Sequence, residues 1–460
     1  MVDAARGIVH QVVAAMSHRL YPVQIAPADC GATLIGTARR DVPLVTVSIE
    51  CKGGEACAPP NTPGLAELTA ALFNEGVHGM PPLEWHRQLE NDAIAMELHP
   101  ETLRWVAHLN CLSSDLDRAL DLFAQWLTQP GLPRGEWKRL VKSFRAGARE
   151  QWAQPIGIID TFSCVQALGR THPLGRPAFE KSYARARYGD ACRMGQQAFC
   201  QGSDLQAMIG GDIDIDQGFE RLGSLLANLP QERQPLADAI QSEPAANPVW
   251  ILDNPDIDQV YFALARPGCR AGDPDRIALR LANYAIGSGG FSSRLMQRVR
   301  SEMGHTYGIH SSLPMDELMS PFQIQSFTHT TNLGAMLDLI TDELDLIRST
   351  GFTAAEVADA RQHLHGSLPL HLTSPDAILH VVSAGLWAGL EVEDLEADWQ
   401  AIPTTSLEQV NEAARRLIGD GAFHLALIGP AQKILPQVDK RGPAAVFPFR
   451  TPPDRWLENV

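Results

Sequence analysis

A long internal repeat is the strongest constraint on how this chain can fold. Two stretches read alike, each as an amphipathic helix, a short turn, a second helix and a proline that opens a third: residues 114–160 and 331–377. The turn glycines and the opening prolines are each 220 positions apart: Gly131 with Gly351, and Pro155 with Pro375. Each copy then closes with a strand that runs into glycine. A repeat of this length predicts duplicated domains and not a short-period solenoid.

A polar, proline- and alanine-rich stretch separates the two copies, as is typical of a domain joint. We therefore predict an N-terminal domain over residues 1–230, a linker over 231–248 and a C-terminal domain over 249–460. With 460 residues, of which 45% are apolar, the chain is long enough for two packed cores.

Both copies mix strand and helix signals. Residues 41–51 are β-branched and bounded by turn residues, and residues 93–112 read as a hairpin that turns near Pro100 and Glu101. Helical spacing marks residues 65–73, 116–127 and 136–149. In the second copy, 249–267 is strand-like and 274–289 is helical. We expect an α+β fold of two homologous domains, each a mixed or antiparallel sheet with helices layered on one face.

Charge and composition exclude several classes of partner. The formal net charge of −16 argues against nucleic-acid and anionic-membrane surfaces, which require basic patches. No run of 18 apolar residues occurs, so we expect no membrane span. Polar residues interrupt the apolar stretch near the N-terminus, so a secretory signal is not expected. The eight cysteines are unevenly spread, which favours buried thiols over a disulfide framework. We expect a cytoplasmic protein.

Two segments carry a family resemblance. Residues 62–76 read TPGLAELTAALFNEG, and residues 292–313 read SSRLMQRVRSEMGHTYGIHSSL. Together with the repeat, they resemble the pitrilysin/insulinase metallopeptidases over about residues 20–440. In that family the first domain carries His-x-x-Glu-His on a helix, where both histidines bind zinc and the glutamate activates water. The resemblance implies a clamshell half built from two such domains.

The zinc motif itself is missing. The frame around it matches, but the first histidine position is Glu67, the general-base position is Ala70 and the second histidine position is Ala71. Alanine can neither bind a metal nor move a proton. Glu150 is a possible register match for the family's last ligand, yet one carboxylate does not make a zinc site. Other histidines lack metal spacing: His78, His86, His99, His108, His363 and His365. The chain is therefore expected to hold no metal.

The substrate-binding signature of the second domain is present. Arg300 and Tyr307 lie seven residues apart with Gly304 between them. By the resemblance, the arginine fork holds a peptide carbonyl or carboxylate, and the tyrosine hydroxyl donates to the developing oxyanion. The alternative is structural, with Arg300 pairing near its own helix end and Tyr307 packed in a strand.

A glycine-rich loop, GSGGFSSR, precedes this signature at residues 287–294. By the resemblance, Gly289 and Gly290 lie near the peptide path; the alternative is a plain turn between helices. A phosphate cradle fits poorly, because the Walker spacing is absent and the loop does not join a strand to a helix.

The resemblance implies a non-catalytic, substrate-binding subunit of a heterodimeric zinc metallopeptidase. The zinc would belong to a homologous partner chain, and the substrates would be short or unfolded peptides, as in bacterial peptide maturation such as pyrroloquinoline quinone biosynthesis. The alternative is a non-enzymatic scaffold, like the core subunits that this family contributes to a respiratory complex.

Overall fold

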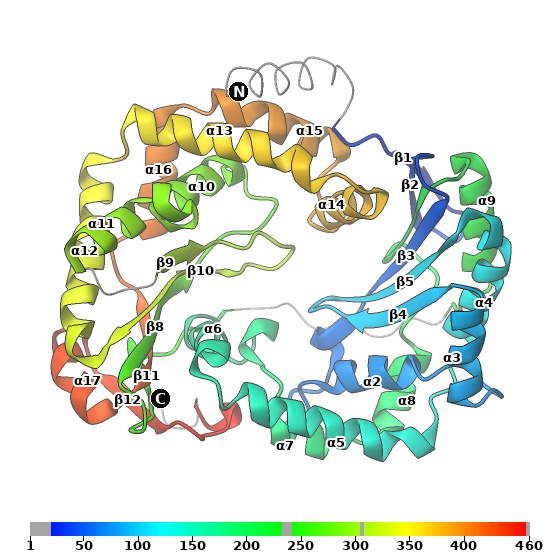
Figure 1. Cartoon of the computed structure of the whole chain (residues 1–460), viewed down its shortest axis with the longest axis horizontal. Coiled ribbons are helices and arrows are strands. Elements are labelled where there is room, and N and C mark those ends of the chain that lie inside the picture. Colours follow the sequence, from blue (N-terminus) through cyan, green and yellow to red (C-terminus); the bar gives the residue numbers. More distant parts are fainter. Residues whose placement is uncertain (1–19, 232–241, 304–307, 457–460) are drawn as a thin grey trace.

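The computed structural model describes residues 20–231, 242–303 and 308–456, without the side chains of residues 300–303. Its strands form two six-stranded sheets, which stand on opposite sides of the molecule (Figure 1). The first sheet contains β1 (Gln24–Pro27), β2 (Thr33–Ala38), β3 (Leu44–Lys52), β4 (Ala95–Pro100), β5 (Arg104–Leu112) and β6 (Leu205–Gly211). The second contains β7 (Val249–Asp253), β8 (Gln259–Pro267), β9 (Ile309–Ser312), β10 (Pro321–His329), β11 (His424–Gly429) and β12 (Ala444–Pro448).

The two sheets repeat one topology. Their strand orders are β1-β2-β6-β3-β5-β4 and β12-β7-β11-β8-β10-β9. Each contains a parallel pair, β2 with β6 or β7 with β11, followed by three antiparallel pairs. They differ at one edge, because β1 runs antiparallel to β2 whereas β12 runs parallel to β7. The predicted α+β fold of two homologous, mixed-sheet domains is confirmed, while the predicted domain limits remain a proposal.

Helices cover the outer side of each sheet (Figure 1). Around the first sheet these are α2 (Leu65–Phe73), α3 (Pro82–Asn91), α4 (Leu116–Thr128) and α9 (Ile215–Leu226), with α7 (Glu180–Arg185) and α8 (Tyr188–Gln196) beside α2. Around the second they are α10 (Arg276–Asn283), α11 (Arg294–Met303), α12 (Leu333–Thr350), α16 (Leu407–Ile418) and α17 (Ala431–Val438). The remaining helices are α5 (Arg134–Gln151), α6 (Pro155–Leu168), α13 (Ala354–His371), α14 (Pro375–Trp387) and α15 (Val392–Ala401).

The turn glycines of the repeat precede matching helices, α5 and α13, for different physical reasons. Gly351 has a φ of 75°, which side-chain-bearing residues rarely adopt. Gly131 has an ordinary φ, but a Cβ there would lie 2.8 Å from the Val77 carbonyl oxygen. The paired prolines, Pro155 and Pro375, both occupy the start of a helix, where proline's missing N–H costs nothing.

The second sheet is buried on both faces, and its inner face is covered by a helix from the other half. On β7, Val249 and Ile251 face the core under the outer helices. Trp250 and Leu252 point the opposite way and pack against α6, chiefly around Phe162. Side chains alternate along a strand, so the continuous apolar run of β7 supplies apolar side chains both to the outer core and to the contact with α6.

The first sheet receives the matching helix, α14, from the second half. Ile35 and Met208 pack with Leu379 of α14, whereas their strand neighbours face the outer core. Polar contacts accompany this packing, because Ser383 Oγ and Trp387 Nε1 of α14 donate to Glu50 of β3 at 2.8 and 2.6 Å. The expectation of helices on only one face is therefore wrong, because the two halves exchange α6 and α14 (Figure 1).

The sequence also predicts that the chain has no membrane span and no disulfide framework. No helix within the described ranges is both long and apolar enough to cross a membrane. All eight cysteines lie in those ranges, and no disulfide joins any of them.

Phe162→Ala is expected to destabilise the whole molecule. Phe162 is fully buried, and its ring centroid lies 4.7 Å from that of Trp456 and 5.4 Å from that of Trp250. Truncating such a side chain costs roughly 3–5 kcal/mol. Ile156→Ala on the same helix is the control, because Ile156 is 67% exposed and should cost less than about 0.5 kcal/mol. Urea unfolding followed by circular dichroism gives both values; equal losses would contradict the helix exchange.

Candidate functional site

Helix α2 carries the positions at which related peptidases place their zinc motif. Its N-cap is Gly64, with a φ of 86°. A Cβ at this glycine would lie 2.5 Å from the Tyr183 ring, so only glycine lets α7 approach the start of α2. The observed helix, Leu65–Phe73, coincides with the stretch predicted from apolar spacing.

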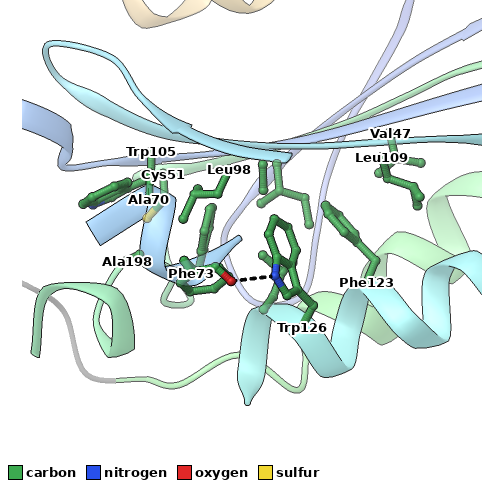
Figure 2. Packing of buried hydrophobic residues seen from close by; sticks show 14 of the residues in the cluster. Val47, Cys51, Ala70, Phe73, Leu98, Trp105, Leu109, Phe123, Trp126 and Ala198 are labelled. Carbon is green, nitrogen blue, oxygen red and sulfur yellow. Dashed lines mark hydrogen bonds between the residues drawn. The ribbon is translucent and has the colours of Figure 1, made fainter. Parts of the chain in front are cut away.

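Packing holds α2 firmly against the first sheet and α4. Figure 2 shows Phe73 and Trp126 in contact beneath β3, β4 and β5. Their ring centroids are 4.9 Å apart in an edge-on arrangement, and Trp126 Nε1 donates to the Phe73 carbonyl at 3.1 Å. Edge-to-face aromatic pairs add about 0.5–1.5 kcal/mol beyond area burial. The helix of the motif is therefore kept in place by its apolar face, independently of any metal.

The three motif positions do not offer a metal site. Ala70 is only 3% exposed and belongs to the core, and Ala71 is half-buried. Of the three, only Glu67 has a side chain that could bind a metal, and its carboxylate already accepts a hydrogen bond from the Tyr183 hydroxyl. Glu150 is exposed on α5. Within the described ranges no group of three or more His, Cys, Asp or Glu side chains could hold a metal. A zinc ion therefore does not fit here.

Several of the other histidines flagged in the sequence are engaged in ring stacking. His99 on β4 stacks on His108 on β5 with ring centroids 5.4 Å apart, and burial lowers the pKa of His108. His363 packs on Tyr284, and His365 stacks on Trp399.

A second carboxylate lies behind α2. Glu55 Oε1 accepts a hydrogen bond of 2.6 Å from the Gly64 N–H. Burial and, secondarily, the nearby Glu67 charge raise the pKa of Glu55 to about 7, against the lowering effect of the Gly64 N–H and of Arg176. Tyr183 and Glu55 were missed by sequence reasoning, because Tyr183 is 116 positions from its partner Glu67 and no local motif joins them.

The predicted substrate-binding pair lies at the edge of what the structure describes. Arg300 falls within α11, but its side chain is outside the described residues, as is Tyr307. Whether the two act on substrate stays a prediction.

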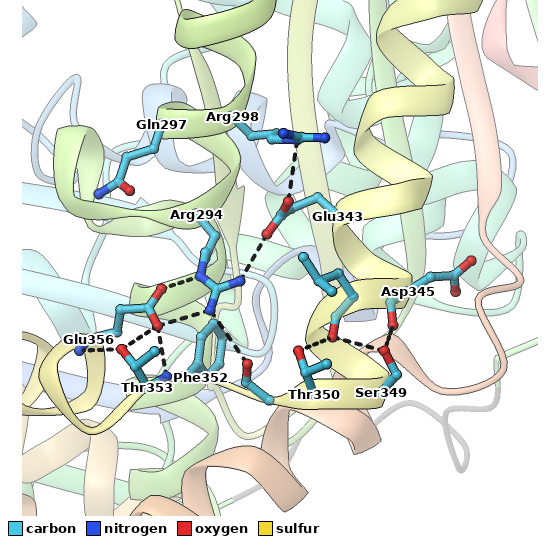
Figure 3. A network of polar contacts seen from close by, with 12 residues as sticks. Arg294, Gln297, Arg298, Glu343, Asp345, Ser349, Thr350, Phe352, Thr353 and Glu356 are labelled. Carbon is cyan, nitrogen blue, oxygen red and sulfur yellow. Dashed lines mark hydrogen bonds and ion pairs between the residues drawn. The ribbon is translucent and has the colours of Figure 1, made fainter.

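Arg294, at the start of α11, has a structural role (Figure 3). Its guanidinium donates to Glu343 of α12 at 3.1 Å and to Glu356 of α13 at 3.0 Å. Burial alone would raise the pKa of Glu356, but hydrogen bonds from Arg294 and Thr353 lower it to about 2. Arg294 thus ties three helices together and holds the beginning of the helix that bears Arg300.

The glycine-rich loop joins two helices and does not follow a strand. The Gly289 N–H donates to the Tyr284 carbonyl at 2.9 Å, and Gly290 has a φ of 55° with open space around it. A Cβ at Gly287 would lie 2.6 Å from Ser311 Oγ, so this glycine lets the loop approach β9. Phe291 at the tip is 73% exposed. The loop geometry is compatible with either a turn or a peptide contact.

The fold is that of a peptidase-like chain, and its helix α2 lacks the residues that would bind a metal at the zinc-motif positions. Two family models match it, insulinase (peptidase family M16) over residues 37–178 and the peptidase M16 inactive domain over residues 196–364. Together they span more than half of the chain. The chain belongs to the M16 peptidase family.

Two similar proteins agree with a non-catalytic member of this family, and a third is named a zinc protease. A non-peptidase homolog, YmxG of Helicobacter pylori, is 22% identical over 377 residues, which cover 81% of this chain and 85% of that one. The crystal structure of a peptidase M16 inactive domain from Pseudomonas fluorescens superposes with a TM-score of 0.80 at 26% identity, covering 89% of this chain and 98% of that one. An uncharacterized zinc protease of Streptomyces coelicolor is 26% identical over 357 residues, covering 74% and 75% of the two chains.

The isolated chain should contain no stoichiometric zinc. Ala70 and Ala71 supply no donor, and the Glu67 carboxylate already accepts from Tyr183. Elemental analysis after dialysis against micromolar zinc is the measurement. About one tightly retained zinc per chain would show that a metal site exists elsewhere.

Glu55→Gln should flatten the pH dependence of stability. Because the Glu55 pKa is raised from 4.5 to about 7 in the folded chain, unfolding releases a proton between these values. The free energy of unfolding contributed by Glu55 therefore falls as pH rises across this window, by at most about 1.4 kcal/mol per pH unit. Urea unfolding at pH 5, 6, 7 and 8 compares the wild type with Glu55→Gln. Exposed Glu84, at the start of α3, gives a control variant, Glu84→Gln, which should keep the wild-type slope.

Proposed function

We propose that this chain is the non-catalytic, substrate-binding subunit of a heterodimeric zinc metallopeptidase that cleaves short or unfolded peptides. The proposal rests on one observation: helix α2 is intact, but it lacks the residues of the zinc motif. Ala70 stands where the general base would be, and Ala71 where the second zinc-binding histidine would be. The fold that would position those two residues is preserved. A chain that keeps the fold and lacks the metal chemistry needs that chemistry from elsewhere.

The partner would be a homologous two-domain chain that carries His-x-x-Glu-His and the zinc. The zinc protease relative of Streptomyces coelicolor matches this chain over three quarters of both lengths, which supports the existence of metal-bearing chains of this size and layout. Two such chains would close as a clamshell around a chamber that admits flexible peptides and excludes folded proteins.

This chain would contribute its second domain to substrate binding. Arg300 would pair with a peptide carbonyl or carboxylate, and the Tyr307 hydroxyl would donate to the oxyanion that develops at the partner's zinc. The ties of Arg294 to α12 and α13 would hold the helix of Arg300 in place. Gly289 and Gly290 would let the loop approach an extended peptide closely.

The setting we propose is the cytoplasm, because all eight cysteines lack disulfides and thiols persist in reducing compartments. A bacterial peptide-maturation step, such as the peptide stage of pyrroloquinoline quinone biosynthesis, would supply suitable substrates.

The second candidate function is a non-enzymatic scaffold within a larger complex. The missing zinc motif is compatible with it, since a scaffold has no use for zinc. An experiment in which the chain is mixed with a candidate partner distinguishes the peptidase subunit from the scaffold. The chain and a neighbouring-gene homologue with an intact motif are purified separately and combined, and cleavage of an unstructured peptide is measured with and without chelator. Chelator-sensitive cleavage that requires both chains supports the proposal, whereas full activity of the homologue alone would favour the scaffold.

Within such a complex, Tyr307→Phe should lower turnover on the order of 100-fold, as loss of other oxyanion donors does. Arg300→Ala should also weaken substrate binding, because a charged fork contributes before the transition state. Steady-state peptide cleavage gives kcat and KM, and size-exclusion chromatography checks that the complex persists.

Arg298→Ala is the matched control for these variants. Arg298 lies on the same helix, with its side chain 45% exposed and 3.6 Å from Glu343, so its loss should change turnover less than about twofold. Wild-type turnover by an intact complex carrying both Arg300→Ala and Tyr307→Phe would remove the catalytic role of the pair.

A further inference from the structure

A small cavity opens behind the start of α2, where three distant parts of the chain meet. Its volume is about 310 Å³, within the range of small-ligand sites. One wall is the turn before α2, with Pro60, Asn61 and Pro63; a second is the segment from Arg170 to Arg185; the third is Pro453 with Asp454 near the C-terminus. The cavity is thus assembled only in the folded chain.

The backbone around this cavity is stiff. Proline rings from each of the three segments line it, and prolines have little backbone freedom to lose when a ligand binds. A Cβ at Gly175 would lie 1.7 Å from the Gly169 carbonyl oxygen, so the second wall doubles back on itself tightly. His172 Nδ1 accepts from the Leu174 N–H at 3.2 Å and fixes that turn.

The charge of the cavity is opposite to that of the protein. Three arginines line it, Arg170, Arg176 and Arg185, against a single acidic residue, Asp454. Arg185 already pairs with Asp454 at 2.9 Å. In a chain with a formal net charge of −16, such a local excess of positive charge concentrates anions.

Arg176 is the most informative of the three. Its side chain is half-buried and donates a long hydrogen bond of 3.4 Å to the Ala56 carbonyl. Burial lowers the pKa of Arg176, against the raising effect of Glu55 and Cys57. Within the described ranges neither Arg176 nor Arg170 has a carboxylate at ion-pair distance. Glu55 is close enough to raise the pKa of Arg176 but not to pair with it, so an anionic ligand would supply the close counter-charge that this half-buried guanidinium lacks.

We propose that this proline-lined cavity is a binding site for a small oxyanion, held by Arg170 and Arg176 with Arg185 at its edge. Guanidinium forks bind the planar edge of a carboxylate or phosphate through two hydrogen bonds. The volume admits one phosphate or the last one or two residues of a peptide with a free carboxylate. The site lies in this chain alone and goes beyond the proposed heterodimer, so it can be tested without a partner.

The test is isothermal titration of the full chain at pH 7 and constant ionic strength. The probes are inorganic phosphate and two tripeptides of one sequence, with a free carboxylate or an amidated C-terminus. We expect one site per chain and at least tenfold weaker binding in Arg176→Gln and in Arg170→Gln. Binding of phosphate alone identifies a free oxyanion as the ligand, and binding of the acid but not the amide identifies a peptide terminus.

Arg221→Gln is the control, because Arg221 lies on α9 and pairs with Asp117 at 3.0 Å, away from the lining residues. It should bind as the wild type does. Arg170 is exposed, so its variant keeps the test valid if loss of the half-buried Arg176 prevents folding. Absence of binding by all three probes, binding of the amide as tightly as the acid when the acid binds, or unchanged affinity in Arg170→Gln would overturn the proposal.

Discussion

The exchange of α6 and α14 is the interaction on which the rest of the structure depends. Each sheet has a conventional outer core and an inner face that only the opposite half can cover. Phe162 fills the space over Trp250 and Trp456, and α14 places Leu379 over the first sheet. Because burial of apolar area is the main favourable term in folding, neither sheet is complete without the other half. We therefore expect the two halves to unfold together.

This arrangement explains how the metal chemistry could be lost without loss of the fold. Helix α2 is held by Phe73 and Trp126 and begins at Gly64 beside Tyr183. None of these contacts involves a metal donor. Ala70 even joins the core, where a glutamate would need a partner. The carboxylate of Glu67, the only possible metal ligand left at the three motif positions, accepts a hydrogen bond from Tyr183. What remains is an intact fold, in which the second domain and the cavity behind α2 are the parts that we propose bind other ligands.

Much of the fold was predictable because residue patterns within single helices, strands and turns indicate it. The spacing of leucines marks α2, the β-branched run marks β3, and the glycine and proline pairs mark the duplicated hairpins of helices. The helix exchange was not predictable, because periodicity shows that α6 has a buried face but not which sheet covers it. The candidate site divides in the same way. Missing motif residues are visible in sequence, whereas contacts such as that of Tyr183 with Glu67 join positions 116 apart and arise only from packing.

The parallel edge strand β12 has a consequence for how the chain is made. Helix α6 ends at Leu168, but the sheet that covers it is completed only by β12 at Pro448, about 280 residues later. At a synthesis rate of roughly 5–20 residues per second, that interval lasts roughly 15–55 s. In the first part of this interval the apolar face of α6 lacks β7 and β8, which later cover it, and β11 follows only near the end. Cover for Phe162 therefore arrives in stages during synthesis, beginning with Trp250 on β7 and ending with Phe447 on β12 and then Trp456.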